Sequence, residues 1–442
     1  MKKLKFVKTI IVLIFVLSFF SVFTACSQNS FTDTASSEGG DMPLSDISKS
    51  VDGLLGSIES GGAGLSRSGL VGKLEDDPTD NDDEVKGHLA PGQITAGEWN
   101  DLRNRDQWLK LFTPNELQEP GVFSEYLDAF NLSTLKMYSV SVLNASDAPI
   151  NDALVTLKDD TGRAIFLART DASGKAYLFP QANSAVSISI TCGQETKSIT
   201  ITENVYEYSV KFSDVLSSVT KRLELMFVVD TTGSMSDELE YLKAEIDDVI
   251  KKVANLTGYD ISLALLFYRD RGDEYVTRYF DFSTDISSHS LNLSQQNATG
   301  GGDTPEAVDI ALSEAVNKQW SVGGGATRLI FHLLDAPPHS DAQNIELYNT
   351  ALLSAAEKGI RIIPIASSGV DKLTEYLLRT EAQVTGGTYV FLTNDSGIGN
   401  SHIEPTVGDF IVEYLNELMI RLIKDFCDGS ITEPIYYGDS QQ

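Results

Sequence analysis

Residues 223–236 read LELMFVVDTTGSMS, and this stretch decides the fold. The run from Leu223 to Val229 is almost entirely apolar and ends at Asp230. A strand that is buried on both faces of a parallel sheet has this composition. A second apolar run, LIFHLL at residues 329–334, also ends in an acid, Asp335. We therefore expect two buried strands that each carry a carboxylate to the same end of a sheet.

Strand and helix patterns alternate around these two runs. Apolar side chains at helical spacing predict a helix over 236–255, and further strands are expected at 261–267, 276–282, 360–366 and 388–392. A last helix is expected from about 407 to 426. This alternation predicts an α/β fold with a doubly wound, Rossmann-like sheet. Ligands of such sheets bind beyond the carboxyl ends of the strands, where the strand order reverses.

The loop after the first run adds hydroxyl groups to the two carboxylates. Thr232 and Ser234 follow Asp230 at alternate positions. Two carboxylates and several hydroxyls suit a hard octahedral cation such as Mg²⁺, which keeps water in its other positions. A simpler role for Asp230 is a negative charge at the N-terminus of the next helix.

The region 222–427 resembles a von Willebrand factor A (VWA) domain with a complete metal-ion-dependent adhesion site. The Asp-x-Ser/Thr-x-Ser motif of that family is matched at 230–234, its second-loop threonine within GGGDTPEA at 300–307, and its third-loop aspartate within LDAPPH at 334–339. The residues that this resemblance assigns to the metal are Asp230, Thr232, Ser234, Thr304 and Asp335. The resemblance implies Mg²⁺ (or Mn²⁺), with one position left open for an acidic side chain of a protein ligand. Asp303 and His339 are candidates for positions around these ligands.

The N-terminus predicts export. Four lysines precede an apolar run from Thr9 to Phe23, which is the pattern of a signal peptide over residues 1–25. The stretch Phe23-Thr24-Ala25-Cys26 resembles a bacterial lipobox, although Phe23 departs from its usual residue. The resemblance implies a lipid on Cys26 and anchoring of the mature protein to a cell membrane, on its extracellular or periplasmic face. Ordinary cleavage after Ala25 and an uncleaved anchor are the alternatives.

Three further segments precede the α/β region. Residues 26–92 are rich in Ser, Gly and Asp and predict a disordered acidic tether, because such a segment cannot bury enough apolar surface to fold. A calcium loop in its acidic run at 75–84 is not expected, because the glycine and the final glutamate of such a loop are missing. Residues 93–136 predict a short helical segment. Residues 137–213 alternate with period two between turn signals, which predicts an all-β sandwich. This part resembles the carboxypeptidase regulatory-like domains of secreted proteins, and residues 428–442 are expected to form a C-terminal tail.

Composition limits the functions that fit. The net charge of −29 argues against nucleic acid as a partner, because a phosphate backbone is held by clustered Lys and Arg. No phosphate-binding glycine loop with its lysine and no Gly-x-Ser-x-Gly occurs in the metal-site loops, so an enzyme is not expected. The sequence therefore predicts a surface protein that binds a protein ligand through Mg²⁺. An envelope assembly or scaffold factor using the same site, and a metal-assisted phosphoesterase, are the alternatives.

Overall fold

The computed structural model describes residues 89–439, apart from 182–184, 214, 216–220, 257, 303 and 324. The chain divides into Met1–Asp82 and Asp83–Gln442, and the described residues all belong to the second unit. The predicted signal peptide, Cys26 and most of the predicted tether lie outside the described residues. Within the described part of the chain, no helix is long and apolar enough to cross a membrane.

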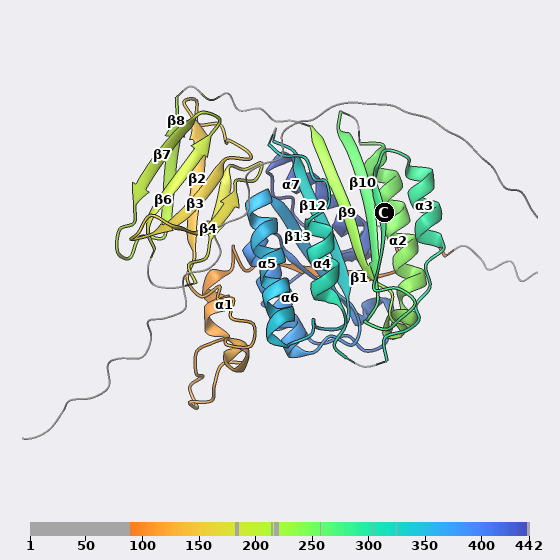
Figure 1. Ribbon diagram of the computed structural model, residues 1–442. Helices are drawn as coiled ribbons and strands as arrows, with labels where there is room; N and C mark the ends of the chain where they lie inside the picture. The colour runs from red at the N-terminus through yellow and green to blue at the C-terminus, as the bar shows by residue number, and fades with distance from the viewer. Residues whose placement is uncertain are drawn as a thin grey trace, which may run out of the picture. The chain divides into compact units, whose positions relative to one another are not determined.

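A mixed sheet of eight strands forms the α/β part (Figure 1). Its strand order is β11-β10-β9-β12-β13-β14-β1-β15. In that order the strands are Thr277–Ser283, Asp260–Tyr268, Arg222–Asp230, Thr327–Leu334, Ile360–Ala366, Tyr389–Leu392, Thr95–Trp99 and Val412–Tyr414. The neighbours β10, β9, β12, β13 and β14 run parallel, whereas β11 and β1 are antiparallel to their partners. The predicted doubly wound α/β fold is confirmed.

Helices cover both faces of this sheet (Figure 1). One face packs against α2 (Leu239–Ala254), α3 (Ile286–Ser294) and α7 (Leu415–Asp428). The other face packs against α4 (Val308–Val316), α5 (Ala342–Lys358) and α6 (Lys372–Thr385). Phe227 of β9 belongs to the first core and its neighbour Val228 to the second. The run 223–229 is apolar without alternation because both faces of β9 are buried.

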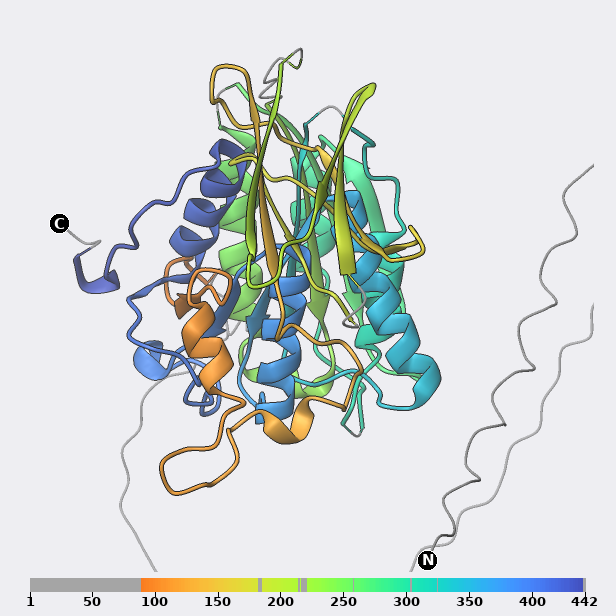
Figure 2. The ribbon, with the colours of Figure 1, turned by 90° about the vertical axis from the view of Figure 1, so that its left-hand side faces the viewer.

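The small β part contains two sheets. One sheet has the order β5-β2-β8 and the other β4-β3-β6-β7. In chain order, β2 to β8 are Tyr138–Asn144, Leu154–Asp159, Ala164–Arg169, Lys175–Leu178, Ala185–Cys192, Glu195–Thr200 and Glu207–Phe212 (Figure 2). Val140 and Val142 are fully buried on one side of β2, and Ser139 and Ser141, which alternate with them, are partly exposed. This alternation is the period-two signal that the sequence carries.

The prediction of a helical segment over 93–136 needs a correction. Thr95–Trp99 is the strand β1, which lies between β14 and β15 in the large sheet. Gly97 lies on β1, where a Cβ would come within 2.6 Å of the Phe391 ring. Just before the strand, the backbone N–H groups of Gly92, Gln93 and Ile94 all donate to the buried carboxylate of Glu245 on α2. The segment therefore completes the sheet.

The rest of that segment does form short helices, α1 (Arg105–Lys110) and the 3₁₀ turn η1 (Ser124–Tyr126). They pack through Trp108, which is fully buried and stacks on Tyr376 of α6. Arg379 of α6 donates two hydrogen bonds to Asp101, at 2.8 and 2.6 Å, and both side chains are buried. Aromatic packing and a buried ion pair thus hold residues 100–136 against the α/β part.

The predicted last helix, 407–426, is also corrected. The helix α7 begins at Leu415, and residues 412–414 form the strand β15 instead. Pairing with β1 explains the change, because Val412 and Glu413 lie opposite Gly97 and Ala96. The remaining 3₁₀ turns are η2 (Gly233–Asp237), η3 (Asn394–Ser396) and η4 (Tyr437–Asp439).

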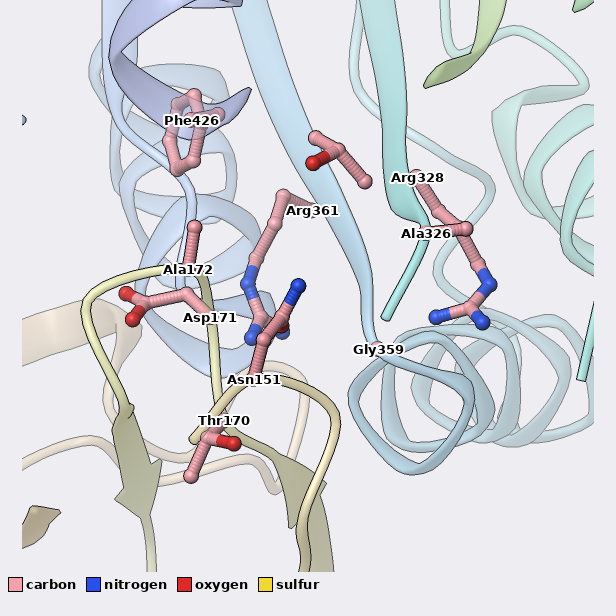
Figure 3. Close-up of a pocket in the computed structure, with 10 residues that line it drawn as sticks. Asn151, Thr170, Asp171, Ala172, Ala326, Arg328, Gly359, Arg361 and Phe426 are labelled. Carbon is pink, nitrogen blue, oxygen red and sulfur yellow. The ribbon is translucent and has the colours of Figure 1, made fainter. Parts of the chain in front are cut away.

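A polar junction joins the small β part to the amino ends of β12 and β13. Arg328 donates to Asp152 at 3.3 Å, and Arg361 donates to the Arg169 carbonyl at 2.6 Å. Burial lowers the pKa of Arg361. A cavity of about 20 Å³ lies here, which is room for a water rather than for a larger ligand. Figure 3 shows the residues that line it. Its lining includes Asn151, Thr170, Asp171, Arg328, Gly359 and Arg361.

Candidate metal centre

The two predicted carboxylates lie at the switch point of the sheet. The strands β9 and β12 are parallel neighbours, with Val229 opposite Leu333. Asp230 ends β9, and Asp335 follows the last residue of β12. The chain leaves β9 through α2 and returns as β10 on one side of β9, whereas β12 lies on the other side of β9. The strand order therefore reverses at β9. Both carboxylates are therefore at the carboxyl edge of the sheet, where a ligand is expected.

The first loop folds around Asp230. One oxygen of this carboxylate, Oδ1, accepts the backbone N–H of Thr232 at 2.8 Å and its hydroxyl at 2.7 Å. The hydroxyls of Thr232 and Ser234 are 3.1 Å apart. The spacing Asp-x-Thr-x-Ser thus brings three oxygen-bearing side chains together in one turn. Asp230 does not cap α2, which begins nine positions later at Leu239, so the simpler helix-charge role is not observed.

Each of the two carboxylates has a buried oxygen without a hydrogen-bond partner among the described residues. These atoms are Oδ2 of Asp230 and Oδ1 of Asp335. Asp230 is 0% exposed and Asp335 is 7% exposed. Buried polar atoms are nearly always paired, so each of these oxygens requires an explanation. A hard divalent cation would supply one, because it binds carboxylate and hydroxyl oxygens. The residues present fit such an ion.

The electrostatics agree with this fit. Burial, and after it repulsion by Asp335, raise the pKa of Asp230 to about 7. Burial also raises the pKa of Asp335 to about 6, against a hydrogen bond from Ser234 that lowers it. Keeping two close, desolvated acids ionised costs free energy. A cation between them would remove this cost.

The second loop is the least constrained part of the predicted centre. Thr304 is exposed, and no hydrogen bond in the described part of the chain joins it to the four other predicted ligands. Asp303 lies outside the described residues. Backbone hydrogen bonds hold the loop on both sides. The N–H of Gly233 donates to the Gly300 carbonyl at 3.1 Å, and the N–H of Glu306 donates to the Pro337 carbonyl at 3.1 Å. The structure brings together Asp230, Thr232, Ser234 and Asp335, and it places Thr304 on a neighbouring loop.

His339 lies at the rim of this group. Its Nε2 is 2.8 Å from Oδ1 of Asp270, which follows β10. Next to Asp270, Arg271 donates to Asp309 at 3.0 Å. Asp273 accepts the backbone N–H of Gly301 at 2.8 Å and so supports the second loop. His339 is therefore bonded to a loop acid beside the centre.

Sequence reasoning missed Glu306. This glutamate is 3% exposed, and its Oε2 has no hydrogen-bond partner within the described structure. Burial, and then the charges of Asp230, Asp270 and Asp335 among others, raise the pKa of Glu306 to about 9. The available signal was an acid two residues after Thr304, in a loop already assigned to the metal centre.

Comparison with known proteins supports the identification of the α/β part. The family model of the von Willebrand factor A domain matches residues 224–397. An ariadne-like RING finger protein of Acanthamoeba polyphaga mimivirus is 31% identical over 223 residues, which are 49% of this chain and 22% of that protein. The alpha-protein kinase vwkA of Dictyostelium discoideum is 29% identical over 154 residues, which are 34% of this chain and 24% of the kinase. The chain thus spans less than a quarter of the length of either relative.

Two solved structures are also similar to part of the chain. The conserved hypothetical protein BatB from Bacteroides thetaiotaomicron has a TM-score of 0.33 and 14% identity, over 46% of this chain and 98% of BatB. The pilus adhesin SpaC from Lactobacillus rhamnosus GG, in its open conformation, has a TM-score of 0.33 and 11% identity, over 55% of this chain and 31% of the adhesin. The matched family region includes the first loop, the second loop and Asp335, so residues 224–397 are similar to a von Willebrand factor A domain.

Proposed function

We propose that this chain is an exported, membrane-anchored surface protein that binds a protein partner through a Mg²⁺- or Mn²⁺-dependent site. The observation that carries the proposal is the pair Asp230 and Asp335, which are buried at the sheet switch point, each with one unpartnered oxygen. Thr232 and Ser234 add hydroxyl oxygens on the same loop. Thr304 is proposed to complete the set when a partner is bound. The role is binding rather than catalysis.

The partner is proposed to contribute an acidic side chain. A divalent cation held by two carboxylates is neutralised by them, but its coordination shell is not filled by four or five protein oxygens. The remaining positions are open to water or to a carboxylate of another protein. The Cys26 lipid is proposed as the membrane anchor, with residues 26–92 as the tether between the anchor and the described part of the chain.

The first test is binding of the metal itself. We expect calorimetric titration of the EDTA-treated protein with MgCl₂ or MnCl₂ to show one site per chain, and Asp230→Ala to remove it. The variant Asp409→Ala, at an exposed acid outside the centre, is the control for the loss of one charge. Equal cation affinity in wild type and Asp230→Ala would refute the site.

The second test concerns partner binding. Proteins cross-linked to the wild type in Mg²⁺, from envelope and host-surface fractions, should be lost in EDTA and in Thr304→Ala. Thr202→Ala, at an exposed threonine in the small β part, should retain them. Partners that persist in both EDTA and Thr304→Ala would show that recognition lies elsewhere on the surface.

A further inference from the structure

A third buried acid faces the proposed centre and has no role among the five predicted ligands. Glu306 is 3% exposed, and its Oε2 has no hydrogen-bond partner among the described residues. Burying an ionised carboxylate with an unpaired oxygen is costly unless a positive charge or a donor compensates it. Asp230 and Asp335 present the same situation at the same edge of the sheet.

Backbone contacts fix Glu306 between the second and third loops. Its N–H donates to the Pro337 carbonyl at 3.1 Å, and residues 306 and 338 form a parallel bridge. Pro337 follows Asp335 by two residues. The position of the Glu306 side chain is therefore tied to the loop that carries Asp335.

The other carboxylate oxygen, Oε1, lies close to Gly301 of the second loop, at the point where this glycine approaches the first loop. Gly301 has a φ of +78°, and a Cβ added there would lie 2.8 Å from Oε1 of Glu306 and 3.3 Å from Cβ of Thr232. Glu306 and Thr232 thus approach the same point from two different loops. A side chain at position 301 would fill this space, and glycine also tolerates the positive φ.

The described part of the chain contains no group of three or more His, Cys, Asp or Glu side chains arranged to hold a metal ion directly. Asp230, Asp335 and Glu306 are therefore not placed for all three to bind one ion directly. Mg²⁺ characteristically keeps several of its bound waters. An acid that accepts a hydrogen bond from a ligand of the ion, without touching the ion itself, strengthens metal binding. We infer that Glu306 is a third acid of the cation site and accepts a hydrogen bond from a water bound to the cation. This inference rests on the proposed function.

The test is Glu306→Gln, which keeps the shape of the side chain and removes its charge. Calorimetry with MgCl₂ and MnCl₂ is expected to show affinity weakened about 10- to 100-fold. Glu314→Gln is the matched control, because Glu314 of α4 is partly exposed and pairs with Lys318, so its loss of charge should leave cation affinity unchanged. Thermal unfolding in EDTA gives a second readout. In EDTA, the Glu306→Gln variant should be at least as stable as wild type. If Glu306 had a purely structural role, the variant would instead be less stable than wild type both with and without the cation.

The outcomes separate the two proposals. Wild-type affinity in Glu306→Gln, with binding abolished in Asp230→Ala, would overturn the inference and leave the metal site standing. Equal destabilisation of Glu306→Gln in EDTA and in saturating Mg²⁺ would also overturn it. A wild-type protein that binds neither Mg²⁺ nor Mn²⁺ would overturn the proposed function and this inference together.

Discussion

Removing divalent cations is expected to make the stability of this protein depend steeply on pH. The cause is Asp230, which is 0% exposed and has a folded-state pKa of about 7, against an ordinary value of 3.8. A raised pKa means that folding favours the protonated acid. Its contribution to stability is therefore fully present below about pH 4 and is lost as the pH rises through about 7.

The size of the effect follows from the shift. The pKa of Asp230 rises by about three on folding, which corresponds to a loss of free energy of unfolding on the order of 4 kcal/mol at high pH, at about 1.4 kcal/mol for each pKa unit. Full burial of Asp230 means that solvent screens little of it. The shift of Asp335 overlaps with that of Asp230, because the two acids repel each other, and is not added to it.

The assay is urea unfolding between pH 4.5 and 8.5, in EDTA and in saturating MgCl₂. In EDTA the free energy of unfolding of the wild type should fall across this range, and Mg²⁺ should restore it at high pH, since a cation stabilises the charged acids. Asp230→Asn should make the fall in EDTA smaller, with the remainder due to Asp335 and Glu306, whereas Asp409→Asn, at an exposed acid, should retain the full fall. The reasoning is refuted if the wild type in EDTA shows no fall, or if Asp230→Asn shows the same fall.

Two further predictions concern the anchor and the N-terminal segment. Cys26→Ser should move the exported protein from the membrane fraction to the soluble fraction on fractionation, whereas unchanged retention would favour an uncleaved anchor or a tightly held partner. Arg379→Met should reduce the free energy of unfolding by about 3–5 kcal/mol, because it leaves the buried carboxylate of Asp101 without its ion-pair partner. Adding Asp101→Asn to Arg379→Met should recover part of this loss, and a double variant no more stable than the single one would contradict the ion-pair argument.

The sequence was sufficient for the sheet centre because its signals are local. The apolar run 223–229 and the run 329–334 each end in an acid, and parallel neighbours place those acids at one edge. The first-loop contacts of Thr232 and Ser234 likewise arise within five residues of chain. Local patterns of this kind predict both the strand and the residues at its end.

Other features depend on contacts between distant parts of the chain. The strand β1 has only five residues, with a glycine in the middle, and it pairs with residues about 300 positions away. Nothing local distinguishes such a segment from a loop or a short helix. The same pairing converts residues 412–414 from predicted helix to strand. Glu306 was missed for a related reason, because its burial arises where three loops meet.

The placement of β1 also has a mechanical consequence. Any tension on the chain before residue 89 enters the α/β part through this strand, whose hydrogen bonds run to β14 on one side and β15 on the other. These bonds are perpendicular to the strand, so a pull along its axis shears them together instead of opening them one by one. The three N–H groups that donate to Glu245 lie ahead of them and would be strained first. A pull on the N-terminal side of the chain is thus borne by β14, β1 and β15 near one edge of the sheet, whereas the candidate metal centre lies at β9 and β12 in its middle.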